Sequence, residues 1–276
     1  MFVFVVCESP NNFLSSSSYP HMKYTFSLRL LTTSIAIFAL RCLLSHNTAF
    51  GQVATATNPP SHDDSTLAKQ LLEVQQRSLQ SMSPERAAKY EESLRAIGET
   101  GVTHKALQVG SKSPMFELPN ARGSKTSLSE KLAKGSVVLT FYRGNWCPFC
   151  NLQLRALQQR LKDFEAAGAS IIAISPQLPD SSLKSVERNS LQFEVLSDVG
   201  SNVARMFNVL FTVPSQQKQY LERYNGSTGA TELPIAATYI IRQDGIISYS
   251  FLESDYRKRS EPEVLLRHLR ELKNKR

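Results

Sequence analysis

Two cysteines, Cys147 and Cys150, are separated by two residues in the segment 143–150, which reads Arg-Gly-Asn-Trp-Cys-Pro-Phe-Cys. The thiolate is the nucleophilic form of cysteine, and two thiols at this spacing can close into a reversible disulfide. The spacing therefore predicts thiol–disulfide redox chemistry. We expect Pro148 to stiffen the loop and Trp146 to shield one side of the pair. Arg143 would add positive charge or pair with an oxyanion.

The elements on either side of the cysteines strengthen this prediction. Residues 137–142, Val-Val-Leu-Thr-Phe-Tyr, are typical of a strand that is buried on both faces. A long helix is expected next, because apolar residues recur at spacings of four and three: Cys150, Leu154, Leu157, Leu161 and Phe164. Both cysteines then lie where a helix begins, and its unpaired N–H groups and positive dipole end favour a thiolate. This setting argues against an inert buried pair.

The rest of the chain alternates between expected strands and helices. We expect strands at 170–175 and 193–196, a helix at 180–189, a hairpin of 237–242 with 246–251, and a last helix after Ser260. The turn of the hairpin is Asp244-Gly245. Such an order predicts an α/β fold whose sheet is mostly parallel at its centre and antiparallel at one edge. The stretch from Phe211 to Leu233 shows no regular pattern and is expected to cross the surface as an irregular insertion.

A helical arm is expected before this domain. Residues 65–97 have a helical pattern, and Ser83-Pro84 marks the start of a second helix. Gly98 and Gly101 would end it. We therefore divide the chain into a leader and linker at 1–60, a helical arm at 61–105 and a redox domain at 106–276. The arm is polar enough to pack on the outside of a domain or against a partner.

The first sixty residues have the pattern of a targeting segment. Lys23 and Arg29 precede the apolar stretch 30–40, and Ala-Phe-Gly at 49–51 offers a small-x-small cleavage site. This order predicts a signal peptide and an exported, periplasmic or otherwise extracytoplasmic protein. An uncleaved membrane anchor and an organellar transit segment are the alternatives. Met22 is an alternative start to Met1.

Composition and charge exclude several classes of protein. The chain has 276 residues, of which 41% are hydrophobic, so it is not collagen, a coiled coil or wholly disordered. Its net charge is +8, and half of that excess lies in residues 255–276, with eight Lys or Arg against four Asp or Glu. We interpret this tail as a solvated helix face and expect no nucleic-acid partner. No metal site is expected, because His62, His104 and His268 do not have the spacing of zinc ligands.

The sequence resembles a known family. Residues 146–150, Trp-Cys-Pro-Phe-Cys, are similar to thioredoxin and dithiol glutaredoxin motifs. Longer segments resemble the peroxiredoxin-like branch of the alkyl hydroperoxide reductase C/thiol-specific antioxidant family: 109–119, 141–157, 173–177, 196–198 and 233–241. The resemblance spans about residues 84–272. It implies a thioredoxin-like fold, with a central mixed sheet flanked by helices and an N-terminal helical extension. It also implies thiol-dependent reduction of peroxides with no metal or organic cofactor.

Two departures from the family pattern leave roles open. Members carry a threonine three residues before the peroxidatic cysteine, and Cys147 occupies that place here, so Cys150 matches the peroxidatic position. In thioredoxins the first cysteine attacks, which would be Cys147. The arginine of the family and the cis-proline of thioredoxins would both fall near Ala236, where the chain has neither. Arg143 is then the nearest cation in sequence.

Three functions agree with these observations. The first is a thioredoxin-dependent peroxidase that reduces hydrogen peroxide or organic hydroperoxides through a cysteine sulfenic acid and a disulfide between the two cysteines. Its partners would be the peroxide and thioredoxin or another dithiol, and it could form a homodimer. The second is a thiol–disulfide oxidoreductase acting on protein disulfides. The third is a non-catalytic redox-sensing module that holds a partner through the arm and the basic tail.

Overall fold

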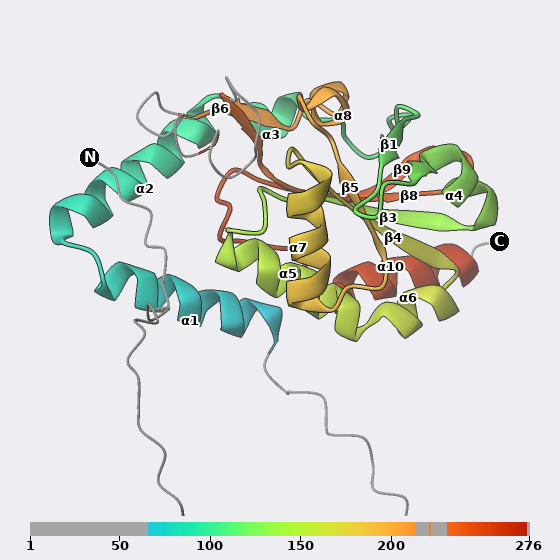
Figure 1. Cartoon of the computed structure of the whole chain (residues 1–276), viewed down its shortest axis with the longest axis horizontal. Helices are drawn as coiled ribbons and strands as arrows, with labels where there is room; N and C mark the ends of the chain where they lie inside the picture. The colour runs from blue at the N-terminus through green and yellow to red at the C-terminus, as the bar shows by residue number, and fades with distance from the viewer. Residues whose placement is uncertain (1–65, 214–220, 222–230, 275–276) are drawn as a thin grey trace, which may run out of the picture. The chain divides into compact units, whose positions relative to one another are not determined.

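The computed structural model describes residues 66–213, 221 and 231–274 (Figure 1). The expected leader and linker at 1–60 lie outside the described residues. The centre of the fold is a five-stranded sheet in the order β5-β4-β3-β8-β9. Its strands are β3 (Ser136–Phe141), β4 (Ala169–Ser175), β5 (Glu194–Ser197), β8 (Ala236–Ile241) and β9 (Ile247–Glu253).

The sheet is mixed, as the sequence predicts. Strands β3, β4 and β5 are parallel, whereas β8 runs antiparallel to both β3 and β9. The parallel strands are joined by helices: α5 (Pro148–Gln159) and α6 (Leu161–Ala166) follow β3, and α7 (Pro179–Asn189) follows β4. Every residue of β3 is buried, because the strand lies in the middle of the sheet. The expected α/β class is confirmed.

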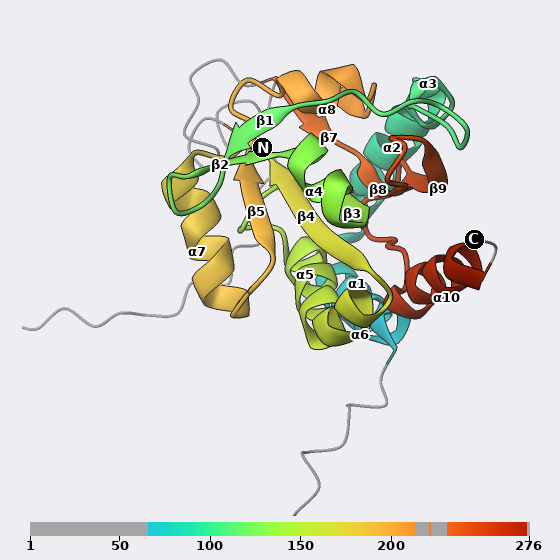
Figure 2. The ribbon, with the colours of Figure 1, turned by 90° about the vertical axis from the view of Figure 1, so that its right-hand side faces the viewer.

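Helices cover both faces of the sheet (Figures 1 and 2). One face packs against α3 (Val102–Lys105), α4 (Leu128–Lys134) and α8 (Asn202–Met206). The other packs against α6 and α10 (Pro262–Asn274). Successive residues of one strand enter different cores: Leu139 belongs to the first and Val138 to the second.

Two helices precede the domain, α1 (Leu67–Gln80) and α2 (Pro84–Glu99). The side chains of Thr66 and Ser83 accept hydrogen bonds from backbone N–H groups in their first turns, which caps both helices. Leu67 and Leu71 of α1 and Leu94 of α2 are buried in the same apolar cluster as the two cysteines. Both helices therefore contribute to the apolar core around the redox motif, and α1 packs against α5.

The expected long helix after Cys150 is interrupted. It ends at Gln159, and α6 starts at Leu161. At the break, Arg160 pairs with Asp163 and also with Glu263 of α10. The apolar pattern is nevertheless confirmed, because the leucines and the phenylalanine that define it are all buried. The prediction of a single continuous helix is wrong, because the backbone leaves helical geometry at Arg160, with φ −105° and ψ 12°.

The stretch 211–233 is less irregular at its ends than expected. Its two ends form the antiparallel strands β6 (Leu210–Thr212) and β7 (Glu232–Pro234), where Phe211 and Leu233 are paired and buried. A short hairpin of β1 (Glu117–Pro119) and β2 (Lys125–Ser127) completes the described strands. No helix within the described ranges has both the length and the apolar character needed to cross a membrane.

Candidate active site

The two cysteines lie at the start of α5, as the sequence predicts. Cys147 is the residue that precedes the helix, Pro148 is its first residue and Cys150 its third. Their side chains are buried, with exposed fractions of 1% and 0%. Both are free thiols, and their Sγ atoms lie 2.7 Å apart. The arrangement brings two sulfurs into direct contact at the positive end of a twelve-residue helix.

The turn between β3 and α5 is held in one conformation. Gly144 has φ +150°, and a Cβ there would lie 2.5 Å from Nε1 of Trp146 and 2.9 Å from Cδ of Gln177, so only glycine fits. The backbone N–H of Asn145 donates to Oε1 of Gln177 at 2.7 Å. The carbonyl of Asn145 accepts from Nδ2 of Asn151 at 2.8 Å, which ties the turn to α5.

Arg143 points into the site. Its side chain is buried, and the guanidinium carbon lies 3.8 Å from the ring centre of Tyr256 and 4.8 Å from that of Trp146. Trp146 is half-buried against this guanidinium, while Pro148 is exposed. The buried Nε of Arg143 has no hydrogen-bond partner among the described residues. A buried N–H donor beside two sulfurs is suited to an incoming oxygen acceptor.

A second arginine, which sequence analysis missed, touches the sulfur itself. Nη2 of Arg259 lies 3.2 Å from Sγ of Cys150, although the two residues are 109 positions apart. Nη1 of Arg259 donates to the carbonyl of Lys258 at 2.7 Å and to that of Tyr256. Its Nε is also buried without a partner among the described residues.

The interpretation of the basic tail as a solvated helix face is therefore wrong for two of its residues. Arg257 and Arg259 are each only 8% exposed, since the segment 255–259 precedes α10 and covers the site. The available signal was their place in the sequence. Arg257, Lys258 and Arg259 come after the last strand and before the helix starts, so they cannot belong to a helix face.

The two thiols differ in the direction in which their surroundings shift the pKa. Burial alone would raise the pKa of Cys150, but a hydrogen bond from Cys147, the charges of Arg259 and Arg143 and the backbone N–H of Arg143 outweigh it. Together they lower the pKa of Cys150 from 9.0 to about 5. Burial and the neighbouring Cys150 raise the pKa of Cys147. The negative charge of the pair thus belongs to Cys150, and Cys147 stays protonated.

Among the described residues, the site presents two guanidinium groups rather than a set of metal ligands. Within the described part of the chain, no group of three or more His, Cys, Asp or Glu side chains is placed to hold a metal ion. Two thiols and two buried guanidinium groups instead suit a ligand rich in oxygen, which can accept hydrogen bonds and take up negative charge.

Comparison with known proteins decides the family. A model of the AhpC/TSA family matches residues 109–250, which include both cysteines and Arg143. The chain belongs to the AhpC/TSA family. Arg259 lies beyond the matched residues, so this family member takes part of its site from outside the matched region.

Curated relatives of this AhpC/TSA chain are peroxiredoxins. It is 34% identical over 122 residues to the chloroplastic peroxiredoxin Q of Gentiana triflora, covering 43% of this chain and 55% of that protein. It is 25% identical over 166 residues to peroxiredoxin Bcp of Escherichia coli (strain K12), covering 60% of this chain and 97% of that protein. With this family and these relatives, the chain is an enzyme of peroxiredoxin type, a thiol-dependent peroxidase.

A solved structure supports the fold. The crystal structure of peroxidoxin BcpB from Mycobacterium tuberculosis superposes with a TM-score of 0.50 at 24% identity, covering 60% of this chain and 98% of that one. At this identity the likeness concerns the fold alone. The expected thioredoxin-like architecture of the AhpC/TSA chain is confirmed.

Proposed function

We propose that Cys150 is the peroxidatic cysteine and Cys147 the resolving one. The observation that carries this assignment is the contact of 3.2 Å between Nη2 of Arg259 and Sγ of Cys150, which Cys147 lacks. A thiolate with a lowered pKa is the attacking form at neutral pH. This choice agrees with the position that matches the peroxidatic cysteine of the family.

In the proposed reaction, the Cys150 thiolate attacks one oxygen of the peroxide. The sulfur–oxygen bond forms as the O–O bond breaks, and the second oxygen leaves as hydroxide or alkoxide, which takes a proton from solvent to become water or an alcohol. Cys150 is oxidised to the sulfenic acid. Arg143 and Arg259 are placed to stabilise the negative charge that develops on the leaving oxygen, since both guanidinium groups are buried beside the sulfurs.

Cys147 then completes the cycle. Its sulfur attacks the sulfenic sulfur of Cys150, water is released, and the two residues are joined by a disulfide. With 2.7 Å between the Sγ atoms, this step needs little movement of α5. Thioredoxin or a similar dithiol would reduce the disulfide: it passes two electrons and two protons to Cys147 and Cys150, which become thiols again, and is itself oxidised to a disulfide.

The protein-disulfide oxidoreductase is a weaker proposal. In that class of enzyme the first cysteine of the pair attacks, and here the first cysteine has the raised pKa. Both cysteines are also buried, with the segment 255–259 over them, which hinders docking of a protein disulfide onto either sulfur. A small peroxide meets no such obstacle once the site opens locally.

A pair of serine variants tests the assignment. Cys150→Ser should abolish the fast reaction with hydrogen peroxide in stopped flow. Cys147→Ser should react once and leave a sulfenic acid that dimedone labels on the tryptic peptide 144–155, which carries both cysteine positions. In the wild type, the same peptide should lose two hydrogens after one equivalent of peroxide. Dimedone labelling at Cys147 in the Cys150→Ser variant would reverse the assignment.

We also propose, on the sequence pattern alone, that the protein is exported and that its leader is removed. The supporting pattern lies at residues 23–51, outside the described residues. An uncleaved anchor and an organellar transit peptide are the alternatives for that segment. Determining the N-terminus of the mature protein would test all three. A homodimer is likewise a proposal, which the mass of the protein in solution would test.

A further inference from the structure

We propose that Glu91 of α2 and Arg257 are positioning residues for this active site: their ion pair holds the segment 255–259 so that Arg259 reaches Cys150. The inference rests on the proposed role of Cys150. It makes the helical arm, which precedes the domain matched by the family, a working part of the site. Neither Glu91 nor Arg257 contacts a sulfur, and both would act on Cys150 through Arg259.

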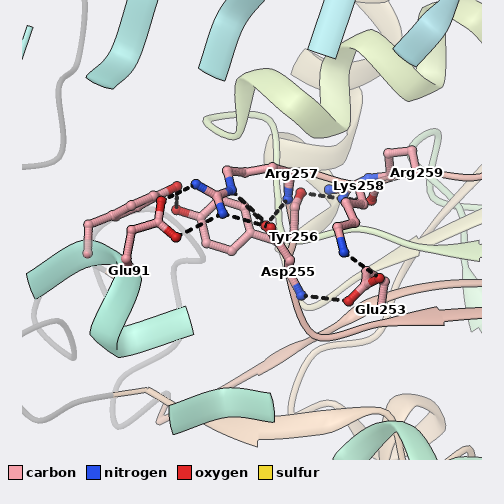
Figure 3. Close-up of polar contacts among 8 residues, drawn as sticks. Glu91, Glu253, Asp255, Tyr256, Arg257, Lys258 and Arg259 are labelled. Atoms are coloured by element: carbon pink, nitrogen blue, oxygen red, sulfur yellow. Dashed lines mark hydrogen bonds and ion pairs between the residues drawn. The ribbon is translucent and has the colours of Figure 1, made fainter. Parts of the chain in front are cut away.

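Arg257 is the centre of a small ion-pair cluster (Figure 3). Its Nη1 lies 2.5 Å from Oε1 of Glu91, and its Nη2 lies 3.1 Å from Oε2. On its other side, Nε lies 2.8 Å from Oδ1 of Asp255 and Nη2 lies 2.8 Å from Oδ2. Each carboxylate receives two hydrogen bonds from one planar group, which fixes the direction of the guanidinium as well as its distance.

A second link joins the same two parts of the chain one residue away. The hydroxyl of Tyr256 donates to the hydroxyl of Tyr90, and the two rings meet edge to face with centres 6.1 Å apart. The guanidinium of Arg257 also lies 5.5 Å from the ring of Tyr90. Two consecutive residues of α2 therefore hold two consecutive residues of the segment 255–259.

The segment needs such anchors, because it belongs to neither a helix nor a strand. One backbone hydrogen bond inside it, from the N–H of Lys258 to the carbonyl of Asp255, measures 3.0 Å. Its side chains face different neighbours: Tyr256 lies against Arg143 and Tyr90, Arg257 pairs with Glu91 of α2, and Arg259 faces Cys150. Holding Arg257 fixes the residues on either side of it.

The pKa of Cys150 should depend on the distance between the guanidinium of Arg259 and the sulfur. A charge–sulfur contact weakens as the guanidinium moves away, and a loop held by fewer side chains samples positions farther from the sulfur. Besides Arg259, the ionisable groups of the described residues that act on Cys150 include Cys147, Arg143 and Tyr142. None of these three belongs to the segment 255–259. A change at Glu91 should therefore reach Cys150 through the segment, by way of Arg259 and of Tyr256, which lies against Arg143.

The test compares Glu91→Gln with Glu92→Gln in the full chain. Glu92 is the next residue of α2 and is exposed, so it matches the change in charge without the contact. The readout is the titration of the Cys150 thiolate by its ultraviolet absorbance, taken as the difference from Cys150→Ser. It does not require a reagent to reach the buried sulfur. Near-ultraviolet circular dichroism and a cooperative melt show that each variant is folded.

We expect Glu91→Gln to raise the pKa of Cys150 by about one unit, which slows the peroxide reaction about threefold at pH 5.5 and little at pH 8. Glu92→Gln should change neither. Tyr90→Phe, which keeps the ring and removes the hydroxyl, should shift the titration in the same direction, and it serves if Glu91→Gln does not fold. Arg257→Lys keeps the charge but lacks the planar guanidinium group that binds both carboxylates, so its titration profile should differ from that of the wild type.

Three results would overturn the proposal: an unchanged titration in folded Glu91→Gln, equal shifts in Glu91→Gln and Glu92→Gln, or a wild-type profile in Arg257→Lys. Failure of the proposed function looks different. A wild-type protein that does not consume peroxide would refute the peroxidase role of Cys150, while the titrations would still report whether α2 positions Arg259.

Discussion

Removing the charge of Arg259 should change how the peroxide reaction depends on pH. The substitution Arg259→Met keeps an unbranched side chain of similar reach and deletes the guanidinium that lies 3.2 Å from Sγ of Cys150. With less positive charge beside the sulfur, the thiolate is less stable relative to the thiol, so the pKa of Cys150 rises toward its ordinary value. The thiolate is then lost at a higher pH.

The structure sets the size of the effect. A unit charge at this distance contributes about 5 kcal/mol at an effective dielectric constant of about 20, or roughly four pKa units as an upper bound. The pKa is lowered from 9.0 to about 5, and Cys147 and Arg143 share in that change. We therefore expect the pKa of Cys150 to rise by about two units, to about 7. The thiolate fraction at pH 6 would fall about tenfold, and that at pH 8.5 would hardly change.

Stopped-flow oxidation by hydrogen peroxide at several pH values measures this change in the pKa of Cys150. The ratio of wild-type to variant rate should be about tenfold larger at pH 6 than at pH 8.5. A further loss of about tenfold, equal at every pH, would report the charge missing from the transition state. Arg267→Met, an exposed position on α10, is the matched control and should leave both quantities unchanged. A wild-type pH profile in folded Arg259→Met would refute the reasoning.

Other substitutions test the rest of the site. Arg143→Met should lower kcat/KM for peroxide by about 10²-fold, and Arg143→Lys should not restore it, because an ammonium group cannot stack flat between two rings; an unchanged second-order rate in folded Arg143→Met would assign the residue to structure alone. Gly144→Ala should lower the free energy of unfolding by about 1–3 kcal/mol in urea denaturation, since its new methyl group meets Trp146; a loss below about 0.5 kcal/mol would contradict the rigid turn. Protein recovered from its native host should lack the residues before about Gln52, and an intact mass that includes Met22 would exclude cleavage.

Sequence patterns sufficed wherever the determining contacts are local. The buried strand β3 is specified by a continuous apolar run, and the start of α5 by the cysteine pair with Pro148 between. The ion pair of Arg160 at the helix break could not be predicted, because Glu263 lies about a hundred residues away on α10. Periodicity reports which face a helix buries, and it carries no information about such a partner.

Prediction of the cysteine chemistry from the sequence was limited in the same way. Spacing predicted that Cys147 and Cys150 would lie together, and the structure places their sulfurs in contact. Which of them carries the negative charge depends on Arg259, and nothing near the motif in sequence points to it. A charge run is ordinarily solvated, so the general rule for the tail was sound and the particular residues departed from it.

The distance along the chain between Cys150 and Arg259 has a consequence for biosynthesis. The cysteines leave the ribosome 109 residues before the arginine does, which at about 5–20 residues per second is roughly 5–20 s. We expect this contact to form late in folding, because it closes a loop of 109 residues. Until then both residues are ordinary thiols, mostly protonated at neutral pH. We therefore expect the cysteines of the nascent chain to react slowly with peroxide, and the enzyme to become sensitive to peroxide when the segment 255–259 docks on the site.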